Sequence, residues 1–365
     1  MPSKLEKNLK GIILYLIKLI CGISQIFILI FILLNLCDLI TAKGQSPPFG
    51  RLKVQNGRLM SEKGKIIQLR GMSLFHSNLQ EGTIFYNAET VRALKCSWRA
   101  NIVRAAMGVY MFSPGYLANK NKEKAKIKAV VDAAIANGMY VLVDWHYTSD
   151  EIFEEAAKQF FKEMSTEYKG VPNVLYEIYN EPVKNSWDVV KRYHEKIIQA
   201  RYLKSNNIHI YLRVIRANDK DAIINCGTPW YDQKILDAYS NPIKNYNNIM
   251  YTLHFYASEG GADQLRKVVE IALKRKFPIF VTEHGLTLGT GDGPINEQQT
   301  NLWWNLLDKY GVSYINWSIC NKKENSAALK PGSTPKDVWK DSALTSSGRI
   351  VKRMLISKNP VPIGC

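Results

Sequence analysis

Two patterns of hydrophobic positions alternate along the chain from residue 66 onward. Short apolar runs of strand length alternate with longer stretches in which apolar residues return every three or four positions, the spacing of a helix. The predicted strands are the eight runs 66–74, 100–108, 139–146, 173–182, 222–227, 248–256, 278–285 and 312–318. Such an alternation is typical of repeated βα units.

The helical pattern is clearest between residues 122 and 138. Its apolar stripe consists of Ile127, Val130, Val131, Ala134 and Ile135. The Asn-Gly pair that follows predicts the C-terminal end of this helix. Further helices are predicted near residues 152–168, 187–204, 262–276, 296–309 and 347–357.

Eight strands with intervening helices predict a single-domain α/β protein, a (β/α)8 TIM barrel. A doubly wound open sheet is the alternative, but no glycine-rich phosphate loop follows the first predicted strand. Active sites of such barrels lie at the C-terminal ends of the strands. In this chain those ends carry Arg104, Trp145, His146, Asn180, Glu181, His254, Tyr256, Glu283 and Trp317.

The carboxylates among these residues suggest a reaction. Glu177 and Glu181 share one face of the fourth strand, with Glu181 nearer the open end. We interpret Glu177 as a structural acid that needs a cationic partner, either Arg70 or Arg104. Glu283 ends the seventh strand, across the barrel mouth from Glu181. Two opposed carboxylates without metal ligands favour cleavage of a glycosidic bond.

The sequence resembles glycoside hydrolase family 5, and most of all its secreted endo-β-1,4-glucanases, or cellulases. The resemblance covers about residues 50–357. It rests on the following motifs, all in the family's order: LRGMSLF, NIVRAAMG, VLVDWHY, YEIYNEP, GTPWYDQ, LHFYA, VTEHG and INWSICNKKENSAAL.

The resemblance implies hydrolysis of β-1,4-glucosidic bonds of cellulose or related β-glucans by a retaining double displacement. Glu181 would be the general acid/base and Glu283 the nucleophile. Asn180 would bind the sugar 2-hydroxyl, while Arg104 and Tyr256 would lie beside the nucleophile. No cofactor and no metal ion are expected.

Further positions match residues that bind the substrate in the family. His146 and His254 match the two site histidines, and Trp317 matches the platform on which a sugar ring stacks. Lys322 and Glu324 match polar residues that bind a more distant glucose.

Several positions depart from the family pattern. His76 and Leu79 stand where tryptophans are expected after the first strand, and we expect this to remove platforms for sugars remote from the cleaved bond. Tyr231, beside Trp230, takes the register of another tryptophan, and His284 follows the nucleophile where Trp or Tyr is more familiar. These changes leave open a mannanase, a xylanase or a mixed-linkage glucanase. A catalytically silent carbohydrate-binding barrel is the alternative from a different class.

The first 42 residues predict a targeting segment. Three early lysines precede an apolar run, and small residues near Ala42 offer a cleavage point. We therefore expect a signal peptide and a secreted protein whose catalytic domain spans residues 43–365. An uncleaved signal anchor is the alternative, because the run is long enough to span a bilayer. We expect a monomer that meets a membrane only through this segment.

The chain is strongly basic, with a formal net charge of +17 over 365 residues. Residues 1–42 hold four lysines and two acids, so the remainder carries +17 − 2 = +15. No nucleic-acid motif accompanies the dispersed lysines, so we expect a polysaccharide partner and no nucleic acid. Attraction to anionic cell-wall polysaccharides and a merely solvated surface both remain open.

Four cysteines follow the targeting segment: Cys96, Cys226, Cys320 and Cys365. A secretory context permits disulfides, and four cysteines allow three connectivities, among which the sequence does not choose. No cysteine or histidine spacing is typical of a zinc site.

Overall fold

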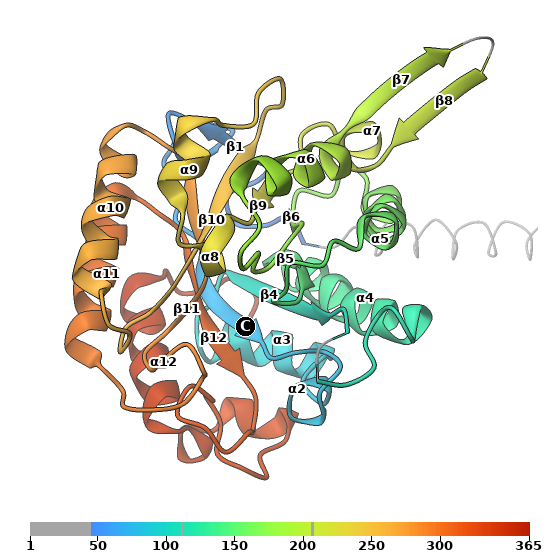
Figure 1. Ribbon diagram of the computed structural model, residues 1–365. Helices are drawn as coiled ribbons and strands as arrows, with labels where there is room; N and C mark the ends of the chain where they lie inside the picture. The colour runs from blue at the N-terminus through green and yellow to red at the C-terminus, as the bar shows by residue number, and fades with distance from the viewer. Residues whose placement is uncertain (1–44, 111, 206–207) are drawn as a thin grey trace, which may run out of the picture. The chain divides into compact units, whose positions relative to one another are not determined.

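Eight parallel strands close into a barrel in the computed structural model, which describes residues 45–365 apart from 111 and 206–207 (Figure 1). Around the barrel the strands follow one another in chain order. They are β3 (Arg70–Leu74), β4 (Ile102–Gly108), β5 (Tyr140–His146), β6 (Val174–Glu177), β9 (Ile224–Cys226), β10 (Ile249–Tyr256), β11 (Ile279–Gly285) and β12 (Tyr314–Ile319). The predicted barrel and all eight predicted strands are confirmed.

Helices follow the strands and surround the barrel (Figure 1). The α-helices are α2 (Gln80–Thr83), α3 (Ala88–Cys96), α4 (Lys120–Ala136), α5 (Glu154–Glu167), α6 (Trp187–Ile198), α7 (Ile215–Asn218), α8 (Pro229–Asp232), α9 (Ile235–Ser240), α10 (Ala262–Lys274), α11 (Glu297–Tyr310) and α12 (Ser346–Lys358). Two 3₁₀ helices, η1 (Pro335–Trp339) and η2 (Asp341–Ala343), precede α12. Helix α4 buries the predicted stripe, of which Ile135 is partly exposed, and Gly138 follows it with a φ of +63°.

The inward side chains of the strands form layers. The layer at the N-terminal end is apolar, and a hairpin of β1 (Leu52–Gln55) and β2 (Arg58–Ser61) adds Leu52 and Leu59 to it. We call this cluster the floor; its other buried members are Ile67, Leu69, Ile102, Tyr140, Leu142, Leu175, Ile223, Met250, Phe280 and Ile315. Two residues further along the strands the inward positions turn polar, with Arg104, Asp144, Glu177, Thr252 and Thr282 all fully buried.

One predicted helix is too long. Helix α6 ends at Ile198, whereas the prediction continued to residue 204. Instead, β7 (Ala200–Ser205) pairs antiparallel with β8 (Ile208–Arg213) before α7 begins. In the sequence, polar and apolar residues alternate over 208–213, which is the period of a strand, and the helix prediction overlooked this signal.

Of the possible cysteine pairings, the structure contains the disulfide between Cys96 and Cys365, across a separation of 269 residues. Cys226 and Cys320 are free and buried. The predicted targeting segment, 1–42, lies outside the described residues. Within the part of the chain that the structure describes, no helix has both the length and the apolar character needed to cross a membrane.

Candidate active site

Arg104 lies at the centre of a charge cluster inside the barrel mouth. Its guanidinium donates to Glu177 Oε2 (2.7 Å), Glu283 Oε2 (2.8 Å) and Asn180 Oδ1 (2.5 Å), and it contacts Asp144 Oδ2 (2.9 Å). Burial alone would lower the pKa of Arg104, but the three carboxylates raise it well above its usual value. The cluster is therefore built around one permanent positive charge.

Glu177 is the internal structural acid that its position predicted, and Arg104 is its partner. Burial would raise the pKa of Glu177, but the Arg104 charge, together with His254 and Thr282, outweighs burial and lowers this pKa to about 2. Thr282 also donates a hydrogen bond to Glu177 Oε1 (2.5 Å). Arg70, the other predicted partner, pairs with Asp308 instead.

Glu283 accepts two hydrogen bonds suited to a carboxylate anion. Arg104 Nη1 donates to one oxygen, and the Tyr256 hydroxyl donates to the other (2.7 Å). Burial and the Glu283 charge raise the pKa of Tyr256 well above its usual value, so its hydroxyl keeps the proton that it donates. These contacts are of the kind that an anionic carboxylate nucleophile requires.

Glu181 has different surroundings. His254 Nδ1 lies 2.9 Å from Glu181 Oε1, and the Thr148 hydroxyl donates to Oε2 (2.8 Å). Burial raises the pKa of Glu181, but the hydrogen bond and charge of His254 outweigh burial and lower it. Burial alone would favour the protonated acid, so the contacts of Glu181, those with His254 first, decide that it is a carboxylate.

The two candidate carboxylates lie close together. One oxygen of Glu181, one nitrogen of His254 and one oxygen of Glu283 all lie within 4.8 Å of one another. Among the described residues this is the trio close enough to hold a metal ion, but Arg104 already supplies a positive charge at Glu283. We therefore assign the trio to proton and covalent chemistry.

An aromatic wall borders the carboxylates. The His146 ring stacks on the Trp317 ring with centroids 5.1 Å apart and planes 11° apart. Burial lowers the pKa of His146 to about 3, so its ring is neutral. We assign the Nδ1 proton to the hydrogen bond with Asp144 Oδ2 (2.7 Å), which leaves Nε2 as an acceptor.

His76 lies nearer to this wall than we expected. Its ring centroid is 4.4 Å from that of His146 and 5.3 Å from that of Trp317, and Leu79 packs against the same cluster as Trp317. The two positions therefore adjoin the predicted sugar platform, and their role for sugars remote from the cleaved bond stays a prediction. Phe112, which is 79% exposed, continues the row beyond His76.

The remaining predicted residues lie outside the charge cluster. Lys322 pairs with Glu324 (2.5 Å), and its ammonium lies 5.4 Å from the Phe75 ring centre, at the edge of the aromatic wall. Trp230 and Tyr231 are both exposed in α8, with left-handed φ angles of +59° and +54°.

His284, which follows the nucleophile, belongs to the barrel wall and not to the mouth. Its ring is fully buried, contacts the Ile315 carbonyl through Nδ1 (2.8 Å) and accepts from Trp304 through Nε2 (3.0 Å). The change from the family pattern at this position therefore alters core packing.

Sequence reasoning missed several residues that contact the cluster, among them Asp144, Thr148, Asp232 and Thr282. Asp144 could have been found, because it precedes His146 by two positions in an apolar strand and so shares its face. Asp232 follows an irregular turn that no periodic pattern predicts. The two threonines are too common in strands and loops to stand out.

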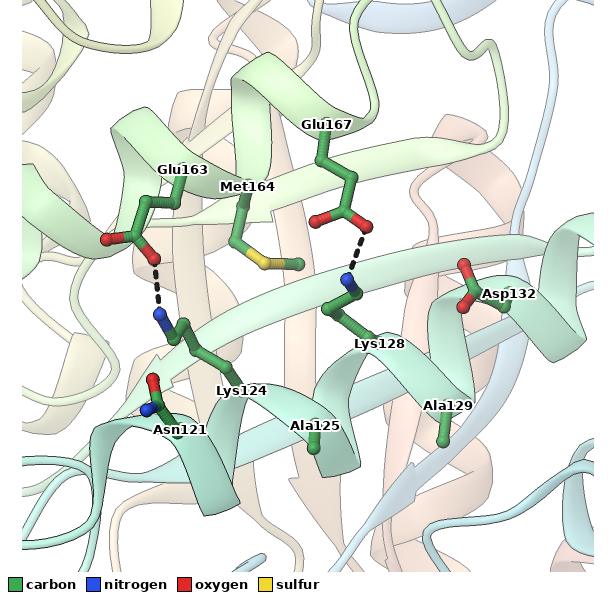
Figure 2. A pocket seen from close by; sticks show the side chains of 9 residues that line it. All are labelled: Asn121, Lys124, Ala125, Lys128, Ala129, Asp132, Glu163, Met164 and Glu167. Atoms are coloured by element: carbon green, nitrogen blue, oxygen red, sulfur yellow. Dashed lines mark hydrogen bonds and ion pairs between the residues drawn. The ribbon is translucent and has the colours of Figure 1, made fainter.

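A groove of about 500 Å³ lies elsewhere, between α4 and α5 (Figure 2). Lys124 pairs with Glu163 and Lys128 pairs with Glu167 across it, each at 2.5 Å (Figure 2). Its lining residues all belong to these two helices, so we ascribe the groove to helix packing on the outside of the barrel.

The geometry agrees with comparisons to known proteins. The family model "Cellulase (glycosyl hydrolase family 5)" matches residues 60–323. An endoglucanase of Clostridium saccharobutylicum is 39% identical over 85% of this chain, and Endoglucanase Z of Dickeya dadantii is 40% identical over 83%. The matched region spans 66%, just under two thirds, of the length of each of these relatives.

Solved structures show the same relationship. A protein from Cytophaga hutchinsonii has a TM-score of 0.77 and 40% identity, covering 85% of this chain and 96% of that chain. The catalytic domain of a Thermobifida fusca endoglucanase, solved with cellotetraose, has a TM-score of 0.73 and 29% identity, covering 84% and 98%. The chain therefore belongs to glycosyl hydrolase family 5.

Proposed function

We propose that the protein is an endo-β-1,4-glucanase that retains the configuration of the anomeric carbon, with Glu181 as acid/base and Glu283 as nucleophile. The observation that carries the proposal is the separation of at most 4.8 Å between an oxygen of Glu181 and an oxygen of Glu283. Retaining glycosidases hold their two carboxyl groups about 5 to 5.5 Å apart, whereas inverting enzymes leave room for a water molecule.

The contacts of each carboxylate divide the roles between them. Glu283, held by Arg104 and Tyr256, attacks the anomeric carbon while Glu181 protonates the leaving oxygen. Glu181 then takes a proton from the water that releases the covalent glycosyl ester. Trp317 and His146 supply an aromatic surface for the sugar ring beside the broken bond.

The relatives favour a glucan as substrate. Both curated relatives reported above are named endoglucanases, and the Thermobifida fusca neighbour holds cellotetraose. None of the relatives reported above is named as a mannanase, a xylanase or a mixed-linkage glucanase. Turnover of soluble carboxymethylcellulose, measured beside mannan, xylan and a mixed-linkage β-glucan, tests this choice.

Purified protein should release reducing ends fastest from carboxymethylcellulose, and proton NMR of a cello-oligosaccharide digest should show the β-anomer first. The Glu283→Gln variant serves as the inactive control in both assays. Binding of cello-oligosaccharides without turnover of any of these glucans would favour the carbohydrate-binding barrel instead. Faster turnover of mannan or xylan would show that the protein is a mannanase or a xylanase of the same family.

We also propose that residues 1–42 direct the protein to the secretory route and are removed, and that the mature protein is a monomer. The Cys96–Cys365 disulfide supports this route, because disulfides persist mainly in oxidising compartments. N-terminal sequencing of protein collected outside the cells should find a start near residue 43. Recovery of Met1 on membrane-bound protein would indicate a signal anchor, and light scattering should give the mass of one chain.

A further inference from the structure

His254 faces two carboxyl groups with one nitrogen. Glu181 Oε1 lies 2.9 Å from Nδ1 of the ring, and Asp232 Oδ2 lies 3.4 Å from the same atom. A ring nitrogen carries at most one proton, so the two carboxyl groups compete for a single N–H. The other nitrogen, Nε2, lies 2.9 Å from the Thr282 hydroxyl.

Asp232 is held at this place by a strained turn. Its side chain is fully buried, Oδ1 accepts the Thr228 backbone N–H (2.5 Å), and Oδ2 has no hydrogen-bond partner among the described residues. Trp230, Tyr231 and Asp232 all have left-handed φ angles, of +59°, +54° and +60°. Residues other than glycine that are held in this region are strained, and they cluster at functional sites.

The charges around Asp232 come from several strands. Glu177, Glu181 and Glu283 are acidic, whereas Arg104 and His254 are basic, and the Tyr179 phenol also faces this region. Burial alone would lower the pKa of His254, but Asp232 first, and then the glutamates, raise it well above its usual value. Burial, by contrast, raises the pKa of Asp232 well above its usual value, while the His254 charge and the Thr228 N–H oppose this rise and favour the carboxylate.

We propose that Asp232 is a positioning residue of the reaction, which retains on His254 the proton that Glu181 delivers to the leaving oxygen. The inference rests on the proposed function. It adds a third carboxyl group to the proposed pair, one that acts through His254 and not through the sugar.

The proton transfer is balanced in atoms and charge. Before cleavage His254 is an imidazolium, and Glu181 and Glu283 are carboxylates. The Nδ1 proton moves to Glu181 Oε1, and Glu181 passes a proton to the glycosidic oxygen as its bond to the anomeric carbon breaks. Glu283 bonds to that carbon, so the products are neutral His254, ionised Glu181, a neutral glycosyl ester and a sugar hydroxyl. Attack by water on the ester returns one proton to the Glu181–His254 pair.

The direction of the expected pH shift follows from the negative charge that Asp232 places beside His254. A nearby negative charge makes every neighbouring group hold its proton to higher pH. Asp232→Asn should therefore move the alkaline limb of the kcat/KM profile for cellotetraose to lower pH, by on the order of half a unit to one unit. The profile of kcat/KM is the appropriate measure, because it reports groups of the free enzyme.

A second substrate separates this role from simple damage to the groove. An aryl β-cellobioside with a good leaving group needs little protonation when its bond breaks. At pH 7 the Asp232→Asn change should therefore lower kcat/KM for this substrate at least several-fold less than kcat/KM for cellotetraose. Asp132→Asn, which removes an exposed acid on α4 that contacts Tyr168, is the matched control and should leave the limb in place.

Three outcomes decide the matter. Equal losses on both substrates with an unmoved limb would overturn the inference and make Asp232 structural. If wild-type protein cleaves neither substrate, the proposed function fails, and not this inference alone. If Asp232→Asn does not fold by thermal unfolding, Asp232→Ser removes the same charge with a smaller group and must show the same shift.

Discussion

The two ends of the barrel are made from the same eight strands but have opposite chemistry. At the N-terminal end the inward side chains form the apolar floor, closed by the β1–β2 hairpin. At the C-terminal end five carboxyl groups lie around Arg104 and His254. Asp144, Glu177 and Glu283 come from the strands, and Glu181 and Asp232 come from the segments after β6 and β9. Stability and catalysis are thus assigned to different ends of each strand.

This difference implies that changes at the mouth should alter rates while changes at the floor alter stability. The largest expected effect is at the mouth. Glu283→Gln should lower kcat/KM on the order of 10⁴-fold or more for both cello-oligosaccharides and an activated aryl β-cellobioside, because no substrate avoids the covalent step. Glu181→Gln should cost the oligosaccharides about 10² to 10⁴-fold and the aryl substrate far less.

Steady-state kinetics of both variants on both substrates checks the assignment. Thermal unfolding should show that both proteins fold. Equal losses for Glu181→Gln and Glu283→Gln on the two substrates would refute the division of roles between the two glutamates.

At the floor we expect a loss of stability with little change in chemistry. Leu142 is fully buried there, so Leu142→Ala should lower the free energy of unfolding by about 3 kcal/mol, from lost burial and the cavity left behind. Leu302→Ala, the same change at a side chain 44% exposed, should cost less than about 0.5 kcal/mol. Urea unfolding measures both.

The pH profile of kcat/KM for Leu142→Ala should match that of the wild type. A shift of that profile would show that the floor and the mouth are not independent.

The histidines sharpen the comparison. His254 at the mouth is held charged, whereas His194, buried in α6, is held neutral, because burial lowers its pKa to about 4. In the unfolded chain this histidine has its ordinary pKa of about 6.5. Between about pH 6.5 and pH 4 it is therefore protonated when the chain is unfolded but neutral when the chain is folded. Lowering the pH through this range thus reduces the stability of the folded protein. His194→Gln should reduce this pH dependence by up to about 1.4 kcal/mol per pH unit.

Urea unfolding at several pH values tests this expectation. Arg192→Gln is the control, because Arg192 is exposed on the same helix and does not titrate in this pH range. This variant should show the same dependence of unfolding free energy on pH as the wild type. An unchanged slope in His194→Gln would mean that His194 is not buried in its neutral form.

The smallest effect is expected at the rim of the mouth. Phe112 extends the aromatic row beyond His76, so Phe112→Ala should raise KM several-fold for long cello-oligosaccharides and hardly at all for the shortest, with kcat unchanged. An aromatic contact of this kind contributes on the order of 1 kcal/mol. Ile363→Ala, which removes another exposed apolar side chain, is the control. A KM ratio that does not grow with chain length would exclude Phe112 from the groove.

Much of this arrangement could be predicted because strands carry a strict two-residue period. Once the apolar runs are aligned as barrel strands, the period places Arg104 and His254 on the inside, whereas Glu283 faces inward because the register of β11 shifts beside it. The same period could have placed Asp144, which we overlooked. All eight barrel strands were predicted because a strand that is buried on both of its faces appears in the sequence as a short, nearly continuous apolar run.

Other features follow from tertiary contacts that no local pattern encodes. Asp232 reaches the mouth through three left-handed residues, and the lowered pKa of Glu181 arises from a histidine 73 positions away. His76 was placed by family register, but its nearness to His146 and Trp317 depends on how the loop after β3 folds back. The β7–β8 hairpin was missed because a helix prediction was extended over it.

The apolar floor has a consequence for how the site exchanges with water. Leu52 and Leu59 of the β1–β2 hairpin join the strand side chains in a cluster whose buried members are each no more than 3% exposed, so the charged layer above it is closed to solvent on the side of the floor. Under the proposed function, a polysaccharide bound at the mouth would cover the remaining side. The number of protons held by the carboxyl groups and His254 is then set at the moment of binding, and the bulk pH acts on the free protein more than on the complex.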